Sequence, residues 1–131
     1  MPDDKQRGTI LVVDDNVEIR RLAKSLLESA GYTVVTAADG EEGLCFYSEH
    51  RSNIALLLTD VVMPKVNGFE LADRVRRVDS NLPVVLMSGS ARSDYQDLEW
   101  LAKPFRPTEL IETVSRALHA QPELKRTASS A

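Results

Sequence analysis

The sequence has little of what would place it in several large classes of protein. Cys45 is the only cysteine among 131 residues, so an intramolecular disulfide is impossible and nothing indicates an oxidising compartment. No apolar run approaches the roughly 20 residues that a membrane-spanning helix needs. The first eight residues are polar and do not resemble a signal peptide. The sequence therefore predicts a cytoplasmic protein without membrane insertion.

The net charge is small and negative. The chain has 16 Lys and Arg residues against 20 Asp and Glu residues, a formal net charge of −4. This balance argues against direct binding of nucleic acid through bulk charge. Hydrophobic residues make up 43% and charged residues 27% of the chain, which is ordinary for a globular protein. A chain of this length fits one domain that needs no disulfide or structural metal.

Apolar, β-branched segments alternate with segments of helical periodicity. Strands are expected at residues 9–13, 33–37, 54–58, 83–87 and, more weakly, 100–102. The segments between most of them carry apolar residues at helical spacing, and a last helix is expected from about Pro107. This alternation predicts an α/β fold with a doubly wound parallel sheet and helices on both faces.

The polar ends of the chain set the expected limits of the domain. Residues 1–8 are expected to be a frayed or disordered N-terminus, and residues 9–120 to form the domain. Residues 121–131 contain Pro122 and end in small polar residues. We expect them to be a C-terminal tail or linker.

Polar side chains follow four of the five expected strands. The first strand ends at Asp14 and Asp15, and the third at Asp60. The fourth ends at Ser88, and the fifth is followed by Lys103. Each of these motifs alone is common in turns and helix caps. In a parallel sheet, however, these ends share the edge where ligands bind, so the motifs together predict one site.

The residue types at this edge favour phosphoryl chemistry. Like charges about 4 Å apart repel by roughly 4 kcal/mol at the effective dielectric near a protein surface. A cation relieves this repulsion, and a few carboxylates with open water positions suit Mg²⁺ better than Ca²⁺. Lys103 adds a positive charge and Ser88 a hydroxyl donor. The set predicts a site for a transferring phosphoryl group, with a carboxylate as the nucleophile.

Five separated motifs occur in the order typical of one protein family. They are LVVDDN (11–16), AADGEEGL (37–44), LLLTDVVMPKVNGFEL (56–71), PVVLMSGS (83–90) and KPF (103–105). Through these motifs the chain resembles the CheY-like receiver domains of two-component response regulators, over residues 9 to about 118. The resemblance implies a flavodoxin-like sheet of five strands in the order 2-1-3-4-5.

The resemblance also implies a role for each residue at the predicted site. Asp60 would be the phosphoacceptor and would take its phosphoryl group from a phosphohistidine. Asp15, Asp14, Asp60 itself and the backbone carbonyl of Val62 would bind Mg²⁺. Lys103 would pair with the phosphoryl group and precede the cis peptide bond of the family.

Two features depart from the usual pattern of the family. Ser88 takes the position of the switch hydroxyl, but Trp100 stands where the family usually has a Tyr or Phe that swings inward on activation. Only 15 positions separate Ser88 from Lys103, fewer than the family commonly has. We therefore expect the fourth helix to be short or absent. Shortened segments of this kind resemble receivers attached to hybrid sensor kinases.

The resemblance implies a signalling module and not an enzyme in the ordinary sense. A histidine kinase or a histidine phosphotransfer protein would donate the phosphoryl group. The domain would assist its own phosphorylation and dephosphorylation, and protein contacts with an unknown output partner would carry the signal. Dimerisation stays open.

Two alternatives remain at this point. One is a pseudo-receiver, a binding module of the same fold that is never phosphorylated. The other, more remote, is a Mg²⁺-dependent phosphohydrolase of the haloacid-dehalogenase group. The pattern of that group requires an acidic residue at the position of Val62, which this chain lacks.

Overall fold

The computed structural model describes residues 8–89 and 98–130, with side chains described to residue 119. Within these ranges the chain forms five strands and four helices. In chain order they are β1 (Thr9–Val13), α2 (Val17–Ser29), β2 (Thr33–Ala37), α3 (Gly40–His50), β3 (Ile54–Asp60), α4 (Gly68–Val78), β4 (Val84–Ser88), β5 (Glu99–Ala102) and α5 (Pro107–Ser130).

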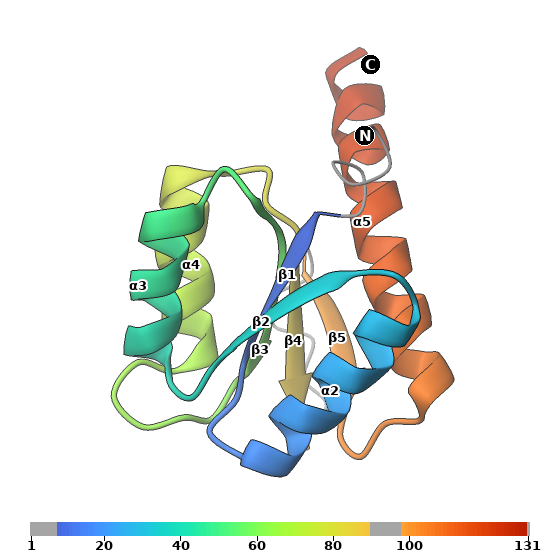
Figure 1. Cartoon of the computed structure of the whole chain (residues 1–131). Helices are drawn as coiled ribbons and strands as arrows, with labels where there is room; N and C mark the ends of the chain where they lie inside the picture. Colours follow the sequence, from blue (N-terminus) through green and yellow to red (C-terminus); the bar gives the residue numbers. More distant parts are fainter. Residues whose placement is uncertain (1–7, 90–97, 131) are drawn as a thin grey trace.

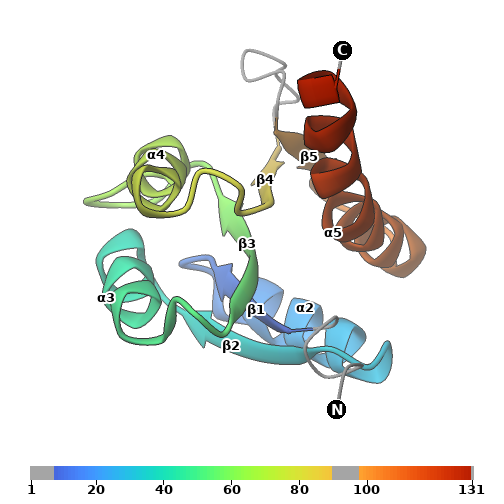
Figure 2. The same cartoon turned by 90° about the horizontal axis from the view of Figure 1, so that it is seen from above.

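The strands form one parallel sheet in the order β2-β1-β3-β4-β5. Helices α3 and α4 cover one face of the sheet, and α2 and α5 cover the other (Figures 1 and 2). The predicted fold class and strand order are therefore confirmed. The prediction of a short or absent fourth helix concerns mainly residues 90–97, and these lie outside the described residues.

The element boundaries differ from the expected ones mainly at the C-terminus. Helix α5 continues to Ser130, so the tail predicted for 121–131 begins inside this helix. That prediction depended on Pro122, which has no backbone N–H to donate, but the backbone stays helical beyond it. At the other end, β1 begins at Thr9 as expected, and residues 1–7 lie outside the described residues.

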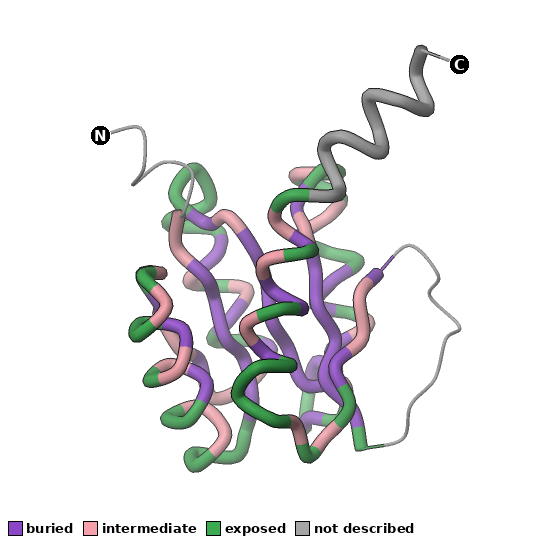
Figure 3. Tube along the Cα trace, turned by 90° about the vertical axis from the view of Figure 1, so that its right-hand side faces the viewer, coloured by how far each residue is buried: buried purple, intermediate pink, exposed green. Residues whose placement is uncertain are grey.

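Successive residues of the central strands pack into two separate cores. In β1, Leu11 and Val13 join the core beneath α3 and α4, whereas Ile10 and Val12 join the core beneath α2 and α5. The tube in Figure 3 accordingly shows the central strands as buried. A sheet covered on both faces exposes its central strands only where they end.

Within residues 8–89 and 98–130, none of the helices combines the length and the apolar character that crossing a membrane requires.

Candidate functional site

Three acidic side chains meet at the carboxyl edge of the sheet, as predicted. Asp14 and Asp15 follow β1, and Asp60 ends the neighbouring strand β3. One carboxylate oxygen from each lies within 4.8 Å of the other two. Asp14 is fully buried, Asp60 is 8% exposed, and Asp15 is exposed. The cluster therefore runs from the protein interior to its surface.

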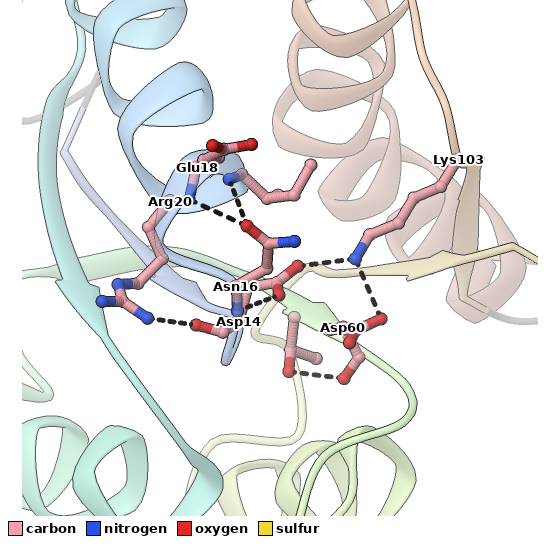
Figure 4. Close-up of polar contacts among 8 residues, drawn as sticks. Asp14, Asn16, Glu18, Arg20, Asp60 and Lys103 are labelled. Carbon is pink, nitrogen blue, oxygen red and sulfur yellow. Dashed lines mark hydrogen bonds and ion pairs between the residues drawn. The ribbon is translucent and has the colours of Figure 1, made fainter.

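Lys103 brings a positive charge to the buried side of this cluster. It follows the edge strand β5, and its backbone N–H donates to the Ser88 carbonyl at 2.9 Å. Its Nζ lies 2.7 Å from Asp14 Oδ2 and 3.3 Å from Asp60 Oδ1 (Figure 4). The expected cis peptide bond joins it to Pro104. The lysine thus bridges two of the three predicted acids.

The loop between β1 and α2 is held by several hydrogen bonds (Figure 4). The Asn16 side chain caps α2 by accepting from the backbone N–H groups of Glu18 and Ile19. The backbone N–H of Asn16 donates to Asp14 Oδ1 at 2.9 Å. Arg20 Nη1 donates to the Asp14 carbonyl oxygen at 2.8 Å. No motif in the sequence singled out Arg20, although its position one helical turn after the cap residue was an available signal.

The chain returns close to the predicted acceptor where α4 begins. The Gly68 N–H donates to the Val61 carbonyl at 2.8 Å, and a Cβ at Gly68 would overlap the carbonyl oxygen of Asp60. Asn67 and Glu70 form a reciprocal capping box at this helix start. A glycine is therefore required here by close contact between two backbone segments.

The other predicted residues lie at or beside this edge. Ser88 ends β4, is buried, and pairs in register with Ala102 of β5. Val62 is 76% exposed. Trp100 packs with the core beneath α3 and α4, where its ring meets Phe69 edge-on at a centroid distance of 6.0 Å. The structure therefore places Trp100 in an aromatic contact with α4.

Burial and charge shift the pKa of the two central groups. The pKa of Asp60 is raised, first by burial and then by the negative charges of Asp14 and Asp15, which together outweigh Lys103. Burial by itself lowers the pKa of the Lys103 ammonium. The hydrogen bond and charge of Asp14, with those of Asp60, outweigh burial and raise it above the usual value. Lys103 therefore does not fully compensate the negative charge of ionised Asp60.

The residues present fit a bound Mg²⁺. Octahedral Mg²⁺ takes oxygen ligands at about 2.1 Å, so its ligand oxygens lie within about 4.2 Å of one another. The three carboxylate oxygens, within 4.8 Å of one another, need to move little to meet that geometry. The raised pKa of Asp60 indicates that a further cation would be favourable.

Replacing Asp60 by Asn is expected to raise the melting temperature at neutral pH without divalent cations. The folded protein holds the Asp60 proton more tightly than the unfolded chain does, because the pKa is raised on folding. Wild-type stability therefore falls as pH rises through the folded pKa. If the substitution removes electrostatic repulsion on the order of 1 kcal/mol, the melting temperature should rise by roughly 3 to 6 °C.

The measurement is the melting temperature of both proteins between about pH 4 and about pH 8. The advantage of the variant should shrink toward acid, where Asp60 is protonated in the folded wild type. An advantage that does not depend on pH, or a wild type that is more stable at neutral pH, would contradict this account.

Comparisons with known proteins point to one family. The sequence profile described as the response regulator receiver domain matches residues 10–115. A probable transcriptional regulator ycf27 of Cyanophora paradoxa is 39% identical over 108 residues, covering 77% of this chain and 44% of that protein. The DNA-binding transcriptional regulator NtrC of a Bradyrhizobium strain is 38% identical over 126 residues, covering 88% of this chain and 25% of that protein. The chain thus spans less than half the length of these two curated relatives.

Solved structures similar to this chain include receiver domains and a response regulator. The receiver domain of the hybrid histidine kinase CckA is 37% identical with a TM-score of 0.76, covering 86% of this chain and 100% of that one. The response regulator TrrA of Thermotoga maritima, crystallised with Mg²⁺ and BeF, is 35% identical with a TM-score of 0.75, covering 84% of this chain and 98% of that one. A receiver domain protein of Clostridium thermocellum is 28% identical with a TM-score of 0.81, covering 89% and 98%.

Proposed function

The chain belongs to the family of response regulator receiver domains, and on this premise we propose that Asp60 is its phosphoacceptor. Receiver domains of this family are signalling domains of two-component systems. The proposed donor is the phosphohistidine of a histidine kinase or of a histidine phosphotransfer protein. The observation that carries the proposal is the joint placement of Lys103 and three carboxylates at the carboxyl edge of the sheet.

In the proposed transfer, an Asp60 carboxylate oxygen attacks phosphorus and forms an acyl phosphate. The P–N bond of the donor breaks, and its electron pair returns to the imidazole. Lys103 Nζ, which lies 3.3 Å from Asp60 Oδ1, would neutralise charge on the arriving phosphoryl oxygens. Mg²⁺ bound by Asp14, Asp15, Asp60 and the Val62 carbonyl would supply further positive charge to those oxygens.

We assign the response to phosphorylation to Ser88 and Trp100. Ser88 ends the strand between those of Asp60 and Lys103, from where its hydroxyl would donate to a phosphoryl oxygen. Trp100, in contact with Phe69, would change its packing as Ser88 moves. The domain would thereby assist its own phosphorylation and dephosphorylation and alter its protein contacts.

The output of the signal is a separate proposal, because the chain spans only part of its relatives. We propose a cytoplasmic domain that transmits through contact with another protein or domain. Direct nucleic-acid binding by these residues is not proposed, given the net charge of −4. The similarity to a hybrid-kinase receiver makes a phosphorelay one such output.

The test is an intact-mass spectrum after incubation with Mg²⁺ and a small acyl-phosphate donor. We expect one phosphoryl adduct on the wild type and none on the Asp60→Asn variant. Asp73→Asn is the matched control, because Asp73 lies exposed on α4 in an ion pair with Arg77, away from the cluster, and this variant should be phosphorylated normally.

Absence of an adduct, also with a panel of phosphohistidine donors, would favour the pseudo-receiver. Steady hydrolysis of a small phosphate ester without a stable adduct would favour the phosphohydrolase.

The proposed metal role of Asp15 makes a prediction for stability. Asp15→Asn removes one of three clustered charges, so it should raise the melting temperature without metal by roughly 3 °C. The wild type should gain about 2.7 kcal/mol at a Mg²⁺ concentration of about 100 times the dissociation constant. The variant should lose most of that gain. Thermal melts with and without Mg²⁺ measure both effects, and a full Mg²⁺ gain in the variant would refute this ligand assignment.

A further inference from the structure

Arg20 contacts a backbone oxygen at the start of the acidic loop. This half-buried side chain leaves the first turn of α2, and its Nη1 donates to the carbonyl oxygen of Asp14 at 2.8 Å (Figure 4). The acceptor is a backbone oxygen at the edge of the acidic cluster. A charged donor makes this hydrogen bond stronger than a neutral one.

The carbonyl that Arg20 binds belongs to the peptide bond between Asp14 and Asp15. The Asp14 carbonyl oxygen and the nitrogen and Cα of Asp15 lie in one rigid plane. A donor that fixes the oxygen therefore fixes the direction in which the chain enters Asp15. The backbone N–H of Asp14 donates to the Ala37 carbonyl at 3.2 Å, so the other side of Asp14 is held as well.

The two acids on either side of this peptide point to different surroundings. Asp14 is fully buried and accepts from Lys103 Nζ at 2.7 Å and from the Asn16 N–H at 2.9 Å. Asp15 is exposed. The orientation of Asp15 therefore depends on its backbone more than that of Asp14 does.

We infer that Arg20 is a positioning residue that holds the Asp14–Asp15 peptide so that the Asp15 carboxylate is presented for Mg²⁺ binding. This inference deepens the proposed function and rests on its metal site. Arg20 acts through the backbone, and its own charge opposes the approach of a divalent cation. Losing the charge alone would strengthen Mg²⁺ binding, whereas losing the positioning would weaken it. The two effects have opposite signs, which makes them separable.

The experiment is a calorimetric titration of Mg²⁺ into the full chain, without any phosphodonor. Arg20→Gln is expected to raise the dissociation constant roughly fivefold or more, since hydrogen bonds to charged groups are among the stronger ones. Arg20→Lys keeps the charge and one donor, and should lie between the wild type and Arg20→Gln. Arg21→Gln is the matched control, because Arg21 is the adjacent, exposed arginine of the same helix. It should bind Mg²⁺ as tightly as the wild type or more tightly.

Two further readouts separate positioning from a general loss of stability. In metal-free protein, the amide resonance of Asp15 should shift in Arg20→Gln and stay in place in Arg21→Gln. With a small acyl-phosphate donor, Arg20→Gln should need more Mg²⁺ for half-maximal phosphorylation, and its rate at saturating Mg²⁺ should return to within about twofold of wild type.

Each outcome decides the inference. Equal or tighter Mg²⁺ binding by Arg20→Gln would overturn it while leaving the proposed function intact. If Arg20→Gln does not fold, Arg20→Lys carries the test, and wild-type affinity in that variant together with a shifted Asp15 amide resonance would overturn the inference. If the wild type itself binds no Mg²⁺, the metal role in the proposed function fails, and the positioning role fails with it.

Discussion

Replacing Lys103 by Met is expected to lower the melting temperature by about 10 °C or more in the absence of divalent cations. The reason is the burial of its partner, because the Asp14 side chain is fully buried and its Oδ2 lies 2.7 Å from Lys103 Nζ. Removing one member of a buried ion pair leaves the other charge uncompensated, which costs about 3 to 5 kcal/mol. The loss should be visible in thermal or urea unfolding.

Lys24→Met provides the matched control. Lys24 Nζ also lies 2.7 Å from a carboxylate oxygen, that of Glu28, but those side chains are 44% and 46% exposed. An exposed pair of this kind contributes less than about 1 kcal/mol. The two lysines thus differ in burial and not in distance. Similar losses in the two variants would contradict the view that burial decides the effect.

Mg²⁺ should restore part of the stability lost in Lys103→Met. A bound cation would replace some of the positive charge that Asp14 and Asp60 lose with the lysine, so the Mg²⁺-dependent rise in melting temperature should exceed that of the wild type. A Mg²⁺ effect equal to that of the wild type would show that metal and lysine act on the cluster independently.

Gly68→Ala is the second substitution with a large expected effect. A Cβ at this position would overlap the Asp60 carbonyl oxygen and lie 2.8 Å from the Val61 Cα. Both obstacles are backbone atoms, so no side chain can rotate away and the loop itself must move. We expect a loss of about 2 to 3 kcal/mol, together with slower phosphorylation, because the displaced strand end carries Asp60.

Gly89→Ala is the control for this substitution. Gly89 follows β4 at the same edge of the sheet, and among the described residues an added Cβ there meets no atom within 4 Å. Its free energy of unfolding should change by less than about 0.5 kcal/mol. Urea unfolding of both variants gives the comparison, and equal stabilities would show that the contact at Gly68 relaxes more easily than its backbone character implies.

The sequence by itself determined the elements of this fold and the residue types of its site. Strand and helix periodicities predicted the parallel sheet, and the family resemblance implied its strand order. Asp14 and Asp15 follow one strand of that sheet and Asp60 ends the neighbouring one, so their meeting at one edge followed from topology alone. The prediction of a tail from residue 121 rested partly on Pro122, and the backbone of α5 continues past this residue to Ser130.

Only the tertiary structure decided which of these groups contact one another. Asp14 and Lys103 are 89 residues apart, and no local pattern states that the lysine lies closer to Asp14 than to Asp60. The same holds for the Arg20 contact with a backbone oxygen and for the close approach of Gly68 to Asp60. Each depends on the exact path of two chain segments in space. Periodicity reports which face of an element is buried, whereas distances between functional atoms are set by packing among elements far apart in the sequence.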